Sequence, residues 1–240
     1  MALEFTEQLV ILAEGKHETH FFSSLIEKRG LPKFQTVCEQ DRMEREEANG
    51  SDAGAEYGGG GRPGFLPFLN GAPLLKGFAN IRALIIVSDN DENPIESFEE
   101  VIGYISKADP IDSYITPPKK FVAPSAQLVK SGGNPQIVVM MIPSKDEKGA
   151  LETLCLQAAA KANPGAMKCV EEFFNCAKIS DWTKTKQDKM KLRSLIAASY
   201  RKNPDLSLAS LWKKNPDLIP LTDTAFDPIA KILLNFEDLL

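Results

Sequence analysis

Three short apolar runs rich in β-branched residues punctuate the sequence, and two of them stop abruptly at acidic residues. The runs occupy residues 8–13, 83–88 and 136–142. Runs of this length and composition are typical of strands buried on both faces of a parallel sheet, because helices cover both sides of such sheets. Amphipathic helical patterns follow the runs. The order predicts an α/β protein with a mostly parallel sheet flanked by helices.

Helical periodicity and stop signals define the other expected elements. Apolar residues recur at helical spacing over residues 18–29, and Gly30 and Pro32 end that helix. The remaining expected elements of the first half are a strand at 33–39, a partly helical stretch at 66–80 and a helix opening at Asn93-Pro94.

The chain is expected to divide into an α/β core over residues 1–163 and a basic helical extension over 164–240 that packs on the core. Within the core, residues 40–64 are charged and then glycine-rich, which predicts a flexible insertion. No Gly-Lys-Ser/Thr follows the glycines and no strand leads into them. A Walker-type phosphate loop is therefore not expected.

Charge is unevenly distributed along the chain. The net charge is −5, yet residues 178–214 contain ten Lys or Arg against three Asp, a local +7 that leaves −12 for the rest. This asymmetry allows an acidic metal site in one region and a phosphate-binding surface in another. A solvated helical face explains the basic run equally well, since charge runs alone are weak signals.

Composition excludes several classes of protein. No apolar stretch approaches the roughly 18 residues that span a bilayer, so no membrane association is expected. The N-terminus lacks the pattern of a secretory signal, and the four cysteines contain no Cys-x-x-Cys pair. These features predict a cytoplasmic protein with free thiols and without a zinc site.

Acidic residues gather where the expected strands end. Glu14 and Glu18 follow the first strand, Asp89 and Asp91 follow the one at 83–88, and Glu152 follows the one at 136–142. The carboxyl ends of parallel strands meet at one sheet edge, and carboxylate oxygens are the ligands that Mg²⁺ prefers. Capping of the following helices could explain one such acid. It does not explain all of them together.

The same residues resemble the TOPRIM domain shared by primases, topoisomerases and OLD-family nucleases. That family has a Glu after its first strand, matched by Glu14, and an Asp-x-Asp after a later strand, matched by Asp89 and Asp91. The chain most resembles a group of uncharacterised, stand-alone TOPRIM-like proteins related to the nuclease branch. The further matching stretches are 141–143, 149–152 and 189–197. The resemblance implies a Rossmann-like TOPRIM core.

The resemblance also implies a nuclease that uses Mg²⁺ or Mn²⁺ to hydrolyse phosphodiester bonds of DNA or RNA. The implied metal ligands are Glu14, Glu18, Asp89, Asp91 and Glu152. Glu14 is expected to act also as general acid or base, and Lys189, downstream in a basic helix, to stabilise charge beside the metals.

Basic side chains near these acids are candidates for binding nucleic acid. They are Lys16, Lys184, Lys186, Lys191 and Arg193. Lysine and arginine neutralise backbone phosphates and give sequence-independent affinity. The resemblance further implies a separate ATPase protein as a partner, with a role in anti-phage defence or DNA repair, and a homodimer is a further expectation.

One departure from the family keeps a second function open. Where some TOPRIM enzymes carry a third Asp, this chain has Asn93, whose amide would ligate a metal weakly. The alternative is a catalytically inactive TOPRIM-like subunit that binds or regulates. A hydrolase of nucleotides or small phosphates is a third possibility.

Overall fold

The computed structural model describes residues 3–42, 61–108, 126–130, 135–143 and 147–240. The flexible insertion expected at 40–64 therefore lies mostly outside the described residues. Its far end is described, and forms a short 3-10 turn at Arg62–Gly64.

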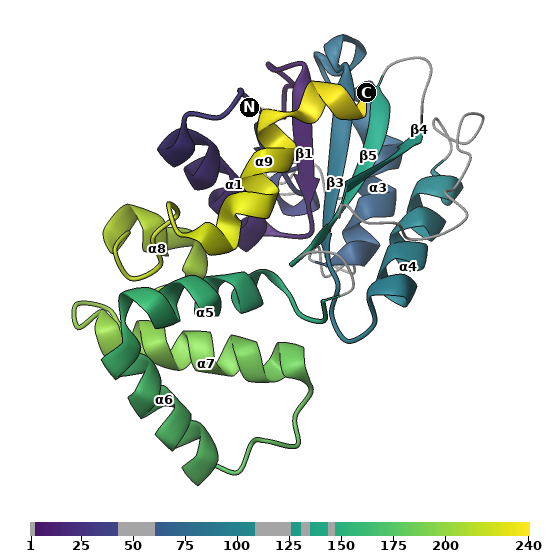
Figure 1. Ribbon diagram of the computed structural model, residues 1–240. Helices are drawn as coiled ribbons and strands as arrows, with labels where there is room; N and C mark the ends of the chain where they lie inside the picture. Colours follow the sequence, from purple (N-terminus) through teal and green to yellow (C-terminus); the bar gives the residue numbers. More distant parts are fainter. Residues whose placement is uncertain (1–2, 43–60, 109–125, 131–134, 144–146) are drawn as a thin grey trace, which may run out of the picture.

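The described strands form one five-stranded sheet with the order β2-β1-β3-β5-β4 (Figure 1). Neighbours are parallel except β4, which runs antiparallel to β5 at one edge. The strands are β1 Leu9–Ala13, β2 Gln35–Val37, β3 Ala83–Asp89, β4 Ala126–Lys130 and β5 Gln136–Ile142. The predicted mostly parallel α/β sheet is confirmed. The sequence pattern did not predict β4.

The central strands are buried on both faces, as their apolar runs indicated. In β3, Ile85 and Val87 belong to one hydrophobic cluster, whereas Leu84 and Ile86 belong to the other. Successive side chains of a strand point to opposite faces, so one run supplies both cores.

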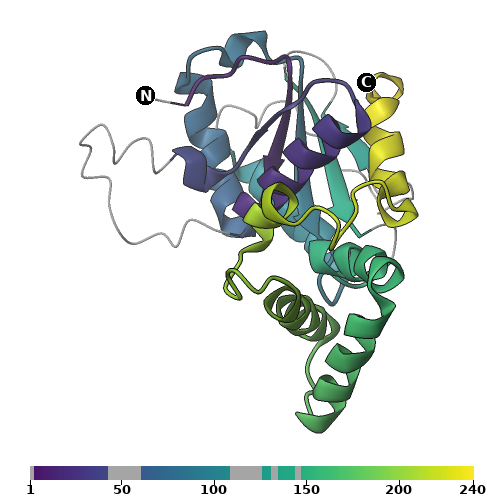
Figure 2. The same ribbon diagram turned by 90° about the vertical axis from the view of Figure 1, so that its left-hand side faces the viewer.

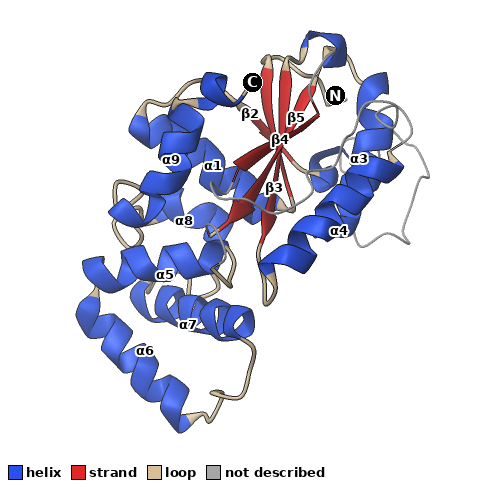
Figure 3. Ribbon diagram, turned by 45° about the vertical axis from the view of Figure 1, so that its right-hand side comes forward, coloured by secondary structure: helices blue, strands red, loops and turns tan. Residues whose placement is uncertain are grey.

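Helices cover the two faces of the sheet separately (Figure 3). One face is covered by α1 Lys16–Arg29, α8 Leu208–Lys214 and α9 Asp227–Leu234, and the other by α3 Phe65–Gly71 and α4 Pro94–Lys107. Pro94 begins α4, as the sequence predicted, because proline needs no amide partner in the first turn. In the structure Asn93 caps this helix.

Three further helices lie beyond the carboxyl ends of the parallel strands (Figure 1). They are α5 Leu151–Ala162, α6 Pro164–Cys176 and α7 Lys184–Ser199. In Figure 2, turned by 90°, the same helices lie below the sheet and its covering helices. These three helices, called the helical floor below, therefore lie next to the sheet edge where Glu14 and Asp89 emerge.

The C-terminal segment shares the hydrophobic core of the sheet. The rings of Trp212 and Phe226 lie 5.6 and 5.2 Å from that of Phe21 in α1, and Phe236 meets Phe34 edge-on at 5.6 Å. Aromatic pairs at such distances add to the stabilisation from buried area. Within the described residues, no helix has both the length and the apolar character needed to cross a membrane.

Candidate functional site

The carboxyl ends of β1 and β3 bring two of the predicted ligands together. The strands are adjacent and parallel, with Ala13 opposite Val87. Glu14 therefore emerges beside Ser88 and Asp89. Its Oε1 accepts hydrogen bonds from the Ser88 hydroxyl and, at 3.1 Å, from the backbone N–H of Asp89. These bonds fix the Glu14 carboxylate on the β3 side of the sheet edge.

Asp89 joins the sheet to the helical floor. It ends β3, is 6% exposed, and its Oδ1 accepts the backbone N–H of Leu151, the first residue of α5, at 3.0 Å. An acidic side chain at this helix end is favoured, because the first backbone amides of a helix lack internal partners. The bond places Glu152, the next residue of α5, close to Asp89.

Glu18 and Glu152 come from the first turns of two helices that face this point. The Glu18 carboxylate lies over Gly15, where an added Cβ would be 3.4 Å from its Oε2. Glu152 Oε2 is buried and has no hydrogen-bond partner among the described residues. A buried carboxylate oxygen without a partner is costly, so it suits a ligand atom.

The electrostatics of the site follow from this crowding. Burial raises the pKa of Asp89 well above its usual value, and the carboxylates of Glu14, Glu18 and Glu152 raise it further. Burial also raises the pKa of Glu14, although the hydrogen bond from Ser88 and the charge of Arg62 oppose it. For Glu18, burial and then the charges of Glu14 and Glu152 raise the pKa to about 7. Neighbouring carboxylates of this kind repel one another when charged, which disfavours their ionised forms in the absence of a cation.

Lys189 of α7 faces the cluster from the helical floor. Burial alone would lower its pKa, but the pKa is raised because the carboxylates of Glu152, Asp89, Asp91 and Glu18 favour the charged form. The structure therefore brings Lys189 into the field of the predicted ligands.

Two polar contacts hold α7 in this position. Glu92 Oε1 accepts the backbone N–H of Thr185 in the first turn of α7 at 2.9 Å. Asp188, 7% exposed, accepts the Thr153 hydroxyl at 2.6 Å and Lys184 Nζ at 2.7 Å. The bonds made by Thr185 and Thr153 link α7 to the loop after β3 and to α5, two segments that also carry predicted ligands.

The loop after β3 has a different arrangement from the one the Asp-x-Asp motif suggested. Asp91 adopts a left-handed conformation with φ 49° and exchanges two backbone hydrogen bonds of 2.7 Å with Gly149. Its side chain meets Arg62. Asn93 Oδ1 accepts the Glu96 N–H at 3.4 Å as the N-cap of α4. Asn93 therefore has a structural role, and it is not among the side chains that converge on Asp89.

Gly149 is required for this bridge. Its φ is 136°, and a Cβ there would lie 2.1 Å from Thr153 Oγ1. Any side chain at this position would displace the start of α5 and with it Glu152.

Sequence analysis did not identify Arg62, the centre of the largest hydrogen-bond cluster at the site. Its guanidinium donates to Asp91 Oδ2 at 2.7 Å, Glu100 Oε2 at 2.9 Å, Ser88 Oγ at 2.9 Å and the Asp89 carbonyl at 2.6 Å. It also lies 3.3 Å from Glu14 Oε1. The signal available in the sequence was its position directly after four glycines. In the structure, the Gly61 N–H donates to the Glu14 carbonyl at 3.0 Å.

The predicted ligands meet two cations. Glu14 and Asp91 pair with Arg62. The carboxylates in the field of Lys189 are Glu152, Asp89, Asp91 and Glu18. Over the described ranges, no group of three or more His, Cys, Asp or Glu side chains is arranged to hold a metal ion as it stands. The donor set nevertheless fits a hard divalent cation, since it consists of carboxylates and includes the orphaned oxygen of Glu152.

The candidate nucleic-acid contacts also divide. Lys184 is bonded to Asp188, and Lys191 pairs with Glu171 at 2.9 Å and lies 4.3 Å above the Phe174 ring. Both stabilise the helical floor. Lys186 and Arg193 are exposed on α7. At three and four residues from Lys189, they share its side of the helix.

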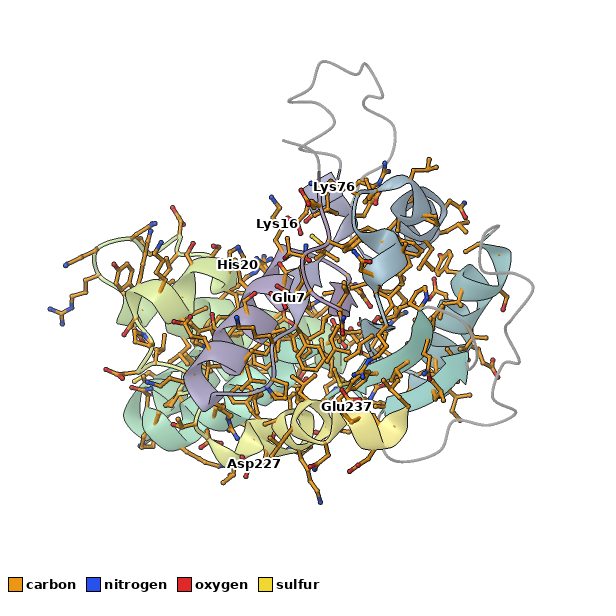
Figure 4. All side chains as sticks on the ribbon, turned by 90° about the horizontal axis from the view of Figure 1, so that it is seen from above. Glu7, Lys16, His20, Lys76, Asp227 and Glu237 are labelled. Carbon is orange, nitrogen blue, oxygen red and sulfur yellow. The ribbon has the colours of Figure 1, made fainter. Side chains whose placement is uncertain are left out.

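Figure 4 shows Lys16 on α1, on the side of the molecule away from Asp227 and Glu237. Lys16 is the first residue of α1, next to Gly15, and lies at intermediate burial between Glu14 and Glu18 in the chain.

A cavity of about 410 Å³ adjoins the cluster, between the start of α1, the start of α5, α7 and residues 204–208. It shares His17, Glu152 and Lys189 with the site. His17 is partly buried and lines this cavity. Burial lowers its pKa, and the nearby Arg193 and Lys189 contribute, against an opposing effect of Glu152.

Comparison with known proteins places the chain in a family. A family described as "Protein of unknown function (DUF3226)" matches residues 8–240. The match covers nearly all of the sequence, so the chain belongs to this family. No curated protein and no solved structure matches the chain.

Proposed function

We propose that this member of the DUF3226 family is a Mg²⁺- or Mn²⁺-dependent phosphodiesterase that hydrolyses DNA or RNA on a TOPRIM-like core. The observation that carries the proposal is the convergence of Glu14, Glu18, Asp89 and Glu152 at the carboxyl ends of β1 and β3. Burial raises the pKa of the first three, and the charges of neighbouring carboxylates raise it further. Such an arrangement costs folding energy, which indicates a functional rather than a structural role.

The residues have separable roles in this proposal. Asp89, Glu18 and Glu152 would hold the cation, with Asp91 as a further ligand once released from Arg62. A bound divalent cation would supply an activated water and stabilise charge on the phosphoryl oxygens. Glu14, with its raised pKa, suits the transfer of a proton to or from the reacting oxygens. Lys189 suits a contact to the non-bridging oxygens of the phosphate.

The position of Arg62 supports a mechanism in which a metal ion replaces the guanidinium as the cation beside these carboxylates. Its guanidinium balances the charges of Glu14 and Asp91, a role that a bound divalent cation would otherwise take. Movement of Arg62 towards Glu100, its third carboxylate partner, would free both ligands. In the proposal, Arg62 neutralises the site until a cation binds.

The partners expected from the sequence belong to the same proposal. Nucleic acid fits the exposed Lys186 and Arg193 beside Lys189. The ATPase partner, the homodimer and the cytoplasmic location rest on the sequence-based expectations alone.

Cleavage assays test the proposal directly. Single- and double-stranded DNA and RNA are incubated with Mg²⁺, Mn²⁺ or EDTA, using wild type and Asp89→Asn. We expect cleavage of at least one polymer that EDTA abolishes and that Asp89→Asn lowers about 1,000-fold, a loss comparable to removing a key electrostatic stabiliser. Absence of cleavage together with absence of cation binding by calorimetry would overturn the proposal.

A non-catalytic binding or regulatory subunit is the second candidate. Two observations favour it: Arg62 pairs with Glu14 and Asp91, and Asn93 serves as a helix cap. This candidate predicts that the protein binds nucleic acid in EDTA with no cleavage under any metal condition. Turnover of mononucleotides without polymer cleavage would instead indicate a small-phosphate hydrolase.

A further inference from the structure

We propose that the cavity beside the acidic cluster binds the base and sugar of a single nucleotide, free or at a strand end, with its phosphate directed to the cluster. The inference rests on the proposed function and deepens it, because it assigns a recognition site for the unit next to the reacting phosphate.

The walls of the cavity suit a nucleobase. Leu192 and Ile196 are one helical turn apart on α7, and they line the cavity together with Leu206 and Leu208 from the segment before and within α8. All four side chains are buried. Opposed apolar side chains can enclose the faces of a flat base, which gives affinity with little dependence on base identity.

The size of the cavity limits the ligand. Its volume of about 410 Å³ lies near the lower end of the roughly 300–1,000 Å³ usual for small-molecule sites. A volume of this size suits a ligand as small as one nucleotide and is too small for a duplex. The rim is polar: Arg193, Asp205 and Ser207 line it and offer donors and acceptors to a sugar or a base edge.

The orientation follows from the shared residues. His17, Glu152 and Lys189 belong both to the cavity lining and to the surroundings of the acidic cluster. The orphaned oxygen Glu152 Oε2 is buried at this junction. A phosphate at this end would meet Lys189 and the cation held by the carboxylates, while the opposite end has the apolar walls. The geometry thus fixes which end of a nucleotide enters.

Binding in the absence of metal tests the inference separately from catalysis. Purine and pyrimidine nucleoside 5′-monophosphates, inorganic phosphate and a short single-stranded oligonucleotide are titrated into wild-type protein in EDTA, with binding followed by ligand-observed NMR and calorimetry. We expect the monophosphates to bind at least tenfold more tightly than inorganic phosphate. Equal binding of both would overturn the base pocket.

Substitutions on α7 provide matched variants. Ala197 is exposed and lines the cavity, whereas its neighbour Ala198 is exposed and does not. We expect Ala197→Trp to weaken monophosphate binding more than tenfold and Ala198→Trp to leave it unchanged. Arg193→Gln, which alters the rim without adding volume, should weaken binding about tenfold and serves if Ala197→Trp does not fold. Unchanged binding in a folded Ala197→Trp, or in Arg193→Gln, would overturn the inference.

The two proposals can fail separately. Cleavage that depends on Asp89, without monophosphate binding sensitive to Ala197→Trp, refutes the pocket and leaves the phosphodiesterase. Monophosphate binding sensitive to Ala197→Trp in a protein that cleaves nothing refutes the enzyme and supports a nucleotide-binding site. The oligonucleotide distinguishes the sources of the ligand: tighter binding than the monophosphates indicates a strand end, and weaker binding indicates a free nucleotide.

Discussion

Two clusters of carboxylates in this protein have opposite electrostatics. At the carboxyl ends of β1 and β3, burial and neighbouring acids raise the pKa of Asp89. The second cluster, Asp223 and Asp227, lies at the corner where the C-terminal segment meets α1 and α5. The pKa of Asp223 is lowered, because hydrogen bonds from Lys161 at 2.8 Å and from the Ala225 N–H outweigh the effect of its partial burial.

The corner cluster is balanced by cations from distant segments. Arg29 donates to the Leu221 and Asp223 carbonyls and to Asp227 Oδ1, each at 2.7 Å, so α1 is tied to the C-terminal segment. Such pairs stabilise the fold modestly. The sheet-edge cluster has more acids than cations and works against the fold. The corner cluster therefore serves stability, whereas the sheet-edge cluster is the one to which the proposed function assigns a cation.

The largest predicted effect separates the two clusters by activity. Asp89→Asn keeps the acceptor for the Leu151 N–H but removes the charge, so we expect metal-dependent cleavage to fall about 1,000-fold. The free energy of unfolding in EDTA should not decrease, because the substitution removes a buried acid whose charge is repelled by the neighbouring carboxylates. The matched control is Asp223→Asn, which should retain full cleavage. Equal cleavage by the two variants would contradict the distinction between the clusters.

The second prediction concerns pH. In EDTA the folded-state pKa of Glu18, about 7, lies above its usual value of 4.5, so the folded chain holds this proton more tightly than the unfolded chain. The resulting stability is present below pH 4.5 and is lost as the pH rises through 7. At about 1.4 kcal/mol per pKa unit, the shift from 4.5 to about 7 gives a loss of at most about 3.5 kcal/mol.

Urea unfolding at pH 5 and pH 8 measures this loss. Glu18→Gln should reduce the pH dependence, and saturating Mg²⁺ should reduce it in wild type, because a cation favours the charged carboxylate. A pH profile identical in wild type and Glu18→Gln would contradict the assignment.

The third prediction tests the internal cation of the sheet-edge cluster. Arg62→Ala leaves Glu14 and Asp91 without their guanidinium, so we expect the free energy of unfolding in EDTA to fall by about 2 kcal/mol. Because the variant lacks the Arg62 guanidinium, which competes with the metal for these carboxylates, we also expect Mg²⁺ or Mn²⁺ to bind several-fold more tightly in calorimetry. Lys76→Ala, which removes an exposed pair with Glu4, is the control and should change neither quantity. Weaker metal binding in Arg62→Ala would show that Arg62 does not compete with the cation.

The smallest effect is expected at the corner. Asp223→Asn should lower the free energy of unfolding by less than about 1 kcal/mol at pH 7, because Lys161 is half exposed and water screens the pair. Since the pKa of Asp223 is lowered in the folded chain, this contribution is present above its unfolded value near 3.8. It is lost as the pH falls further. Thermal unfolding at pH 7 and pH 3 should show the difference between wild type and variant only at pH 7.

Particular residues show which features of the fold and of the site could be predicted from the sequence alone. The runs that became β1, β3 and β5 were predicted because they are continuous and apolar, a pattern that parallel strands require. The strand β4 was missed because its five residues carry no such pattern, and its pairing with β5 is what defines it. Asn93 was interpreted as a weakened metal ligand, but its position before Pro94 equally signalled the cap that the structure shows.

The sequence by itself determined the edge of the sheet at which the acids lie. Glu14 follows one strand and Asp89 ends another, and parallel strands place their carboxyl ends at the same edge. Only the tertiary structure decided what meets those acids. Arg62 donates hydrogen bonds to Asp89 and Asp91, which are 27 and 29 residues away in the sequence. Lys189 lies near the acids because Glu92 accepts the backbone N–H of Thr185, which is 93 residues away. Contacts of that span depend on packing of the whole core, which no local pattern encodes.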